Sequence, residues 1–182
     1  GRTWAPACTN FLDERGNPGA WGRAIMATLD RPEFAMMLDG TKMSDLRAMC
    51  PAFLNPNYSL DAKKKFWVFF IASMAMSESS CNPNPKLKRG PNGFLAGILQ
   101  LHLGSESEYG CPPTNARNPI SSATCGMTML KNQVIKYGNI FVQRGKTYWQ
   151  VLWSGTSGAA KVSNRVVAQR ACQQGMRTTR AR

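Results

Sequence analysis

The chain has 182 residues and a formal net charge of +13, from 23 lysines and arginines against 10 aspartates and glutamates. A hydrophobic content of 43% is ordinary for a folded domain and excludes a disordered chain. The positive charge favours an acidic partner such as nucleic acid, an anionic membrane or an acidic cell wall. Because the basic residues are spread along the chain, they indicate a charged coat on a fold, and we expect no nucleic-acid partner.

The first part of the chain predicts short helices. Residues 20–29 form the first. Asp30 and Pro32 are typical of a helix start, and that second helix should end at Gly40. A third short helix is expected between residues 44 and 50.

The segment from residue 59 to 77 contains neither Gly nor Pro and is rich in aromatic and aliphatic side chains. Ser59 is a suitable N-cap. At roughly 1.5 Å per residue, such a helix crosses a small domain of about 30 Å. The pattern therefore predicts a long, buried central helix.

After residue 85 the pattern changes. Short alternating stretches around the Gly90–Gly93 turn predict a small β-hairpin. Asn118 and the proline after it begin another helix, which should end at Gly138, and further helices are expected at 147–153 and 164–174. The fold class is therefore α+β, predominantly α-helical, with a buried central helix and a small hairpin region.

Six cysteines are widely spaced, and no two form a CxxC pair. Close pairs are typical of zinc sites and redox dithiols, whereas this spacing predicts three disulfides made in an oxidising compartment. The alternative is free buried thiols. The connectivity stays open among Cys8, Cys50, Cys81, Cys111, Cys125 and Cys172. No transmembrane run is present, and we expect a monomeric, secreted protein, periplasmic or extracellular, whose signal peptide has been removed.

Glu78 follows the apolar stripe of the central helix formed by Trp67, Ile71 and Met74. Partial burial and the negative end of the helix dipole both disfavour the charged carboxylate and raise its pKa. A carboxylic acid that stays protonated near neutral pH can donate a proton to a glycosidic oxygen. The alternative is a solvated glutamate at a frayed helix end.

The surrounding residues provide a family resemblance. The order Glu78-Ser79-Ser80, Asn82-Pro83, then Gly97-Ile98-Leu99-Gln100 resembles the soluble lytic transglycosylases and goose-type lysozymes. The resemblance covers residues 66–101 well and 118–130 more loosely. It departs from the family at Trp153-Ser154-Gly155, where the family often has Tyr-Asn-x-Gly.

The resemblance implies a lysozyme-like fold with Glu78 as the catalytic acid of a cleft. It also implies substrate-binding roles for Ser79, Gly97 and Gln100, although a structural hydrogen bond to backbone suits Gln100 equally. We expect one lysozyme-like domain, with an N-terminal elaboration at 1–58, a catalytic core at 59–175 and a basic tail at 176–182.

A second catalytic carboxylate is less clearly indicated. Glu106 and Glu108 are the best placed, yet a solvated polar loop explains them as well, and a lytic transglycosylase needs only one acid. The same two carboxylates suggest a further hypothesis. An acidic cleft margin would favour wall glycan that has lost acetyl groups and carries ammonium ions.

Aromatic residues also belong to the predicted site. Four of them offer flat faces for sugar rings, although core packing is their alternative role: Tyr109, Tyr137, Tyr148 and Trp153. His102 is the only histidine, so a Ser-His-Asp triad and a His-rich metal site are both disfavoured. Nucleotide-binding glycine loops are absent, and we expect no metal and no cofactor.

The sequence thus predicts a hydrolase or lytic transglycosylase that cleaves the glycan strands of peptidoglycan. The alternative from another class is a non-enzymatic cationic protein that binds the cell wall or inhibits an enzyme, because charge and disulfides suit both.

Overall fold

The computed structural model describes residues 4–91, 93–103, 106–111 and 116–173. It is mainly helical, with a small antiparallel sheet and three disulfides, which confirms the predicted fold class. The α-helices are α1 (Ala20–Leu29), α2 (Ala35–Asp39), α3 (Leu46–Met49), α4 (Leu60–Ser79), α5 (Pro119–Tyr137) and α6 (Ser157–Val167). Short 3₁₀ helices are η1 (Pro6–Asn10), η2 (Pro32–Phe34), η3 (Pro51–Leu54), η4 (Glu106–Tyr109) and η5 (Gln150–Leu152). The strands are β1 (Lys88–Gly90), β2 (Gly93–Ala96) and β3 (Leu101–His102).

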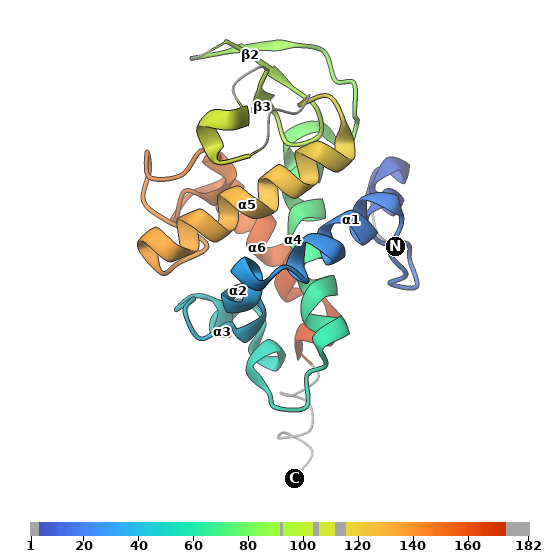
Figure 1. The fold of residues 1–182 in the computed structure, drawn as a ribbon, viewed down its shortest axis with the longest axis vertical. Coiled ribbons are helices and arrows are strands. Elements are labelled where there is room, and N and C mark those ends of the chain that lie inside the picture. Colours follow the sequence, from blue (N-terminus) through green and yellow to red (C-terminus); the bar gives the residue numbers. More distant parts are fainter. Residues whose placement is uncertain (1–3, 92, 104–105, 112–115, 174–182) are drawn as a thin grey trace.

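Helix α4 is the predicted central helix. The Ser59 hydroxyl accepts a hydrogen bond from the Ala62 backbone N–H at 3.0 Å and caps its first turn. Every residue from Phe66 to Ala75 is buried, because α1, α5 and α6 all pack against this helix. In Figure 1, α1 crosses α4, and the sheet lies beyond the C-terminal end of α4. The core therefore surrounds α4, and Glu78 lies where the helix leaves it.

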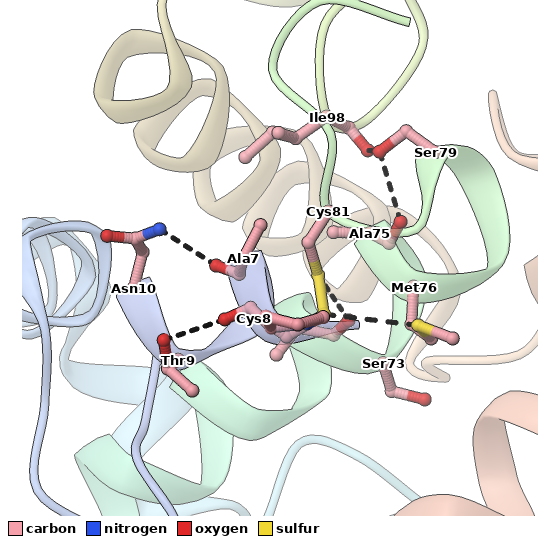
Figure 2. The surroundings of a disulfide bond; sticks show 12 residues. Ala7, Cys8, Thr9, Asn10, Ser73, Ala75, Met76, Ser79, Cys81 and Ile98 are labelled. Atoms are coloured by element: carbon pink, nitrogen blue, oxygen red, sulfur yellow. Dashed lines mark hydrogen bonds between the residues drawn. A yellow bond between two sulfur atoms is a disulfide. The ribbon is translucent and has the colours of Figure 1, made fainter. Parts of the chain in front are cut away.

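The C-terminal end of α4 is firmly fixed. Ser80 and Cys81 both adopt positive φ angles of 54° and 58°, and their N–H groups donate to carbonyls of the last two turns. Cys81 then forms a disulfide with Cys8 of η1 (Figure 2). The turn that carries Glu78 is thus held by its own backbone and by a covalent link to the N-terminal segment.

The predicted hairpin and the helix after it are both present. Strands β1, β2 and β3 form one antiparallel sheet in that order, with Gly90 opposite Gly93 across the turn. Helix α5 begins where the Asn118 side chain accepts a hydrogen bond from the Ser121 N–H, and it ends at Gly138 with φ 71°. Both boundaries of α5 agree with the sequence prediction.

Other boundaries were predicted wrongly. Asp30 ends α1 and does not cap the next helix, which begins with the 3₁₀ turn η2. The helix expected at 147–153 is reduced to η5. The helix expected at 164–174 is instead α6, which starts earlier because the Thr156 hydroxyl caps it by accepting from the Ala159 N–H.

The disulfide pattern settles the connectivity that the sequence left open. All six cysteines are paired. The pairs are Cys8–Cys81, Cys50–Cys172 and Cys111–Cys125, with sequence separations of 73, 122 and 14 residues. Two of the three bridges therefore close long stretches of chain.

Candidate active site

A cleft of about 740 Å³ lies at the C-terminal end of α4. The β-hairpin forms one side through Lys88, Pro91 and Leu95, and the segment 145–153 forms the other. Glu78, Gln100 and His102 lie between the two sides. The volume is in the range of sites that hold a small organic ligand.

Glu78 lies in the last turn of α4 and is partly buried in this cleft. Burial raises the pKa of its carboxyl group to about 7, and the ammonium group of Lys88 acts in the opposite direction by lowering it. A carboxyl group with this pKa is present in both protonation states near neutral pH. It is therefore suited to donate a proton and take it back.

The turn formed by residues 97–100 joins the two sides of the cleft. Its four carbonyl oxygens accept side-chain hydrogen bonds, in chain order, from Gln100 Nε2 (3.0 Å), Ser79 Oγ (2.7 Å), Trp149 Nε1 (3.1 Å) and Tyr148 Oη (2.7 Å). The end of α4 and the segment at 148–149 are therefore fixed to the same turn.

Gly97 and Ser79 both help to hold the turn at residues 97–100 in place. Gly97 has φ 74°, and a Cβ atom there would lie 2.0 Å from the Ala116 carbonyl oxygen, so no larger residue fits. Ser79 donates to the Ile98 carbonyl (Figure 2). Gly97 does not line the cleft with Glu78. The geometry gives both residues structural contacts, and their predicted role in binding substrate stays a prediction.

Gln100 combines the two roles that the sequence left open. Its side-chain nitrogen donates to the Gly97 carbonyl, and the residue also lines the cleft. Gln100 has φ 52°, which is unusual for a residue with a side chain. The hydrogen bonds of the turn hold this conformation, and such strained residues often occur at functional sites.

The remaining predicted residues divide between two pockets. Tyr148 and Trp153 line the cleft with Glu78. Tyr137 and Glu108 instead line a neighbouring pocket of about 340 Å³. The side chain of Glu106 lies outside the described residues. Among the described residues that line the cleft, Glu78 is the only carboxylate.

Five polar residues that line the cleft were given no role in the site by the sequence reasoning. They are Ser77, Lys88, His102, Thr147 and Gln150. Within the described chain, His102 Nε2, Thr147 Oγ1 and Trp153 Nε1 are buried atoms without a hydrogen-bond partner. Buried polar groups normally have partners, so Thr147 Oγ1 and Trp153 Nε1 are unused hydrogen-bonding groups of the cleft wall. His102 Nε2 lies against Gly90, and His102 Nδ1 is paired with the Tyr109 hydroxyl at 2.9 Å. His102 could have been predicted, because it lies two residues after Gln100 and side chains two apart in an extended chain point to the same side. Nothing in the local sequence indicates Lys88 or Thr147.

No group of three His, Cys, Asp or Glu side chains gathers into a possible metal site in the part of the chain that the structure describes. Within the same residues, no helix combines the length and the apolar character needed to cross a membrane.

The titration of Glu78 leads to a testable pH dependence. If Glu78 acts as a proton donor, kcat/KM of the reaction that it catalyses should fall as the pH rises through about 7, because only the protonated carboxyl group can donate. Lys88 lowers the pKa of Glu78, so Lys88→Gln should shift this decline to higher pH. Lys86→Gln removes the same charge outside the cleft and serves as the control. Equal profiles for both variants would contradict the assigned role of Lys88.

Comparisons with known proteins identify the family to which this fold belongs. The family model of the transglycosylase SLT domain matches residues 58–174. None of the curated proteins matches the chain. The structure is similar to Bd0314 DslA, wild-type form 2, with a TM-score of 0.69 and 22% identity over 84% of this chain and 91% of that chain.

Two glutamate-to-glutamine mutants of the same protein are also similar, each at 21% identity. Their TM-scores are 0.68, over 84% of this chain and 91% of the other, and 0.72, over 94% and 100%. At this level of identity the likeness shows the fold alone. The family match covers more than half of the chain, including α4, the sheet, α5 and α6. The chain therefore belongs to the transglycosylase SLT domain family, whose members are lytic transglycosylases of peptidoglycan.

Proposed function

We propose that this protein cleaves the glycan strands of peptidoglycan in the cleft at the end of α4, with Glu78 as the catalytic acid. The observation that carries the proposal is the partly buried Glu78, whose pKa is raised to about 7, in a cleft lined by aromatic and polar side chains. Family membership supports the same substrate class.

The proposed reaction needs only one carboxyl group, which acts first as an acid and then as a base. Glu78 gives its proton to the oxygen of the glycosidic bond, and the bond from that oxygen to the sugar C1 breaks. The resulting carboxylate takes the proton of the C6 hydroxyl of the same sugar, whose oxygen then bonds to C1. The products are a shortened strand and a 1,6-anhydro end, and Glu78 is protonated again. Hydrolysis with a water nucleophile instead calls for a second carboxylate or an equivalent base.

Product analysis tests this mechanism. Because Glu78 is the only carboxylate among the described lining residues, we expect 1,6-anhydro ends, which are lighter than hydrolysis products by one water molecule. Mass spectrometry of released muropeptides measures the difference. Products formed in H₂¹⁸O that carry the heavy oxygen would instead indicate hydrolysis.

The proposed location of the protein outside the cytoplasm and its positive net charge both fit peptidoglycan as the substrate. The three disulfides are consistent with an extracytoplasmic protein, and we propose that it is secreted. The net charge of +13 then attracts it to the anionic wall, and this attraction weakens with salt. A non-enzymatic cationic wall-binding protein would share this behaviour. Clearing of a suspension of purified walls at moderate salt distinguishes the two, because binding alone does not solubilise the wall.

A preference for de-N-acetylated wall is a separate proposal. It rests on Glu108, which lines the neighbouring pocket, and on Glu106. Lys136 and Lys146 line the same pocket as Glu108, so an ammonium group there would meet repulsion as well as attraction. If the preference holds, Glu108→Gln should lower the ratio of cleavage of de-N-acetylated to acetylated wall by about 2- to 5-fold. A ratio below one in the wild type, or an unchanged ratio in the variant, would refute it.

A further inference from the structure

A second pocket of about 340 Å³ adjoins the cleft that contains Glu78. The two share Thr147, Tyr148 and Trp149 as a common border. The pocket lies between η4, the C-terminal half of α5 and the segment that leads into the cleft. A ligand bound at Glu78 therefore has this pocket directly beside it.

The pocket has a distinctive set of charges. Lys136 comes from the last turn of α5 and Lys146 from the loop after it, and both ammonium groups lie over the ring of Tyr137, at 5.3 and 5.6 Å from its centre. Glu108 is the only carboxylate among the described lining residues. Two cations brought together from different elements favour a ligand with a carboxylate. The neighbouring carboxylate of Glu108 can in addition pair with an amino group of the same ligand.

The border between the two spaces contains an unpaired polar atom. Thr147 Oγ1 is buried and has no hydrogen-bond partner among the described residues. A buried hydroxyl without a partner costs free energy unless a ligand satisfies it. The border between the two pockets therefore holds an unused hydrogen-bonding group.

We propose that this second pocket binds the peptide stem of peptidoglycan through Lys136 and Lys146. This inference rests on the proposed function, because the glycan strand must occupy the cleft. The stems are short peptides attached to alternate sugars, and they carry free carboxylates together with amino groups. Their charges match those of the pocket, whereas an N-acetylglucosamine ring offers no charge for two lysines to bind.

The test compares two substrates and two double variants. The substrates are intact wall and the same wall freed of its peptides by an amidase. Lys136→Gln/Lys146→Gln should lower kcat/KM on intact wall by about 5- to 20-fold, since two partly exposed ion pairs are lost. It should lower kcat/KM less on stem-free glycan, which keeps only the lactyl carboxylate that the amidase releases. Lys42→Gln/Lys161→Gln removes the same charge at exposed positions outside both pockets and is the control.

Equal losses in the two double variants, or equal losses on both substrates, would overturn the inference. Binding of a soluble stem tetrapeptide, measured by titration calorimetry or NMR, tests it without catalysis. The wild type and the control variant should bind the peptide, and the Lys136→Gln/Lys146→Gln variant should not. Wild-type binding no stronger than that of this variant would refute the stem site. If Glu78→Gln retains full activity while the peptide still binds, the proposed reaction fails and the stem site stands.

Discussion

Replacing Glu78 with Gln should lower the rate of muropeptide release by about 10²- to 10⁴-fold, the usual contribution of a positioned general acid. Glutamine keeps the shape of the side chain and removes the transferable proton. Release of soluble muropeptides from purified wall measures the effect. Ser77→Ala is a suitable control, since Ser77 also lines the cleft one residue away but has no place in the proposed proton transfer. Equal activity of Glu78→Gln and the wild type would exclude this acid.

The same substitution has a predictable effect on stability, which separates loss of chemistry from loss of fold. The pKa of Glu78 is raised from 4.5 to about 7, so the folded state binds its proton more tightly than the unfolded state does. The contribution of the Glu78 carboxyl group to the free energy of unfolding is fully present below pH 4.5 and is lost as the pH rises through about 7.

A shift of this size corresponds to roughly 3 kcal/mol. Glu78→Gln should therefore be more stable than the wild type at pH 8.5, by up to about that amount, and equally stable at pH 4. Thermal unfolding at the two pH values measures this. A variant that is inactive and also unfolded at pH 8.5 would show that the residue is needed for folding, contrary to the proposal.

Removing the Cys50–Cys172 bridge with a pair of alanines should destabilise the fold by about 5 kcal/mol in the chain-entropy account, because it closes the longest loop, with a sequence separation of 122 residues. That loss is comparable with the whole stability of many domains. The Cys111–Cys125 pair, with a separation of 14 residues, should cost about 3 kcal/mol. Chemical denaturation of both double variants measures the difference, and the reverse order would contradict the loop-length argument.

The third bridge should affect catalysis as well as stability. Cys81 follows Glu78 by three residues and pins the end of α4 to Cys8. At a temperature where all variants are folded, loss of this bridge should lower kcat, because misplacement of a catalytic group by about 1 Å is costly. The Cys50–Cys172 variant should keep its kcat under the same conditions. Unchanged kcat in both would show that the backbone hydrogen bonds of Ser80 and Cys81 suffice to place Glu78.

Much of the fold was determined locally by the sequence. The N-caps Ser59 and Asn118 and the stop at Gly138 act within one helical turn, so the sequence placed the ends of α4 and α5 closely. The position of Glu78 at the end of an apolar stripe likewise depends only on helix periodicity. The start of α6 was predicted too late, at residue 164, because Thr156 was not recognised as a helix cap.

The composition of the site was decided by contacts between distant segments. Lys88 is close enough to lower the pKa of Glu78 only because the hairpin folds over the end of α4. The family motif at 97–100 indicated the cleft, but its hydrogen bonds to Trp149 and Tyr148 cross about fifty positions and have no local signal. The disulfide connectivity also depends on contacts between distant segments, and so does the pocket that brings Lys136 and Lys146 together. The sequence alone therefore determined the central helix and the position of Glu78 in its last turn. Only the tertiary structure decided which residues surround Glu78, because burial and Coulomb interactions depend on distances in space.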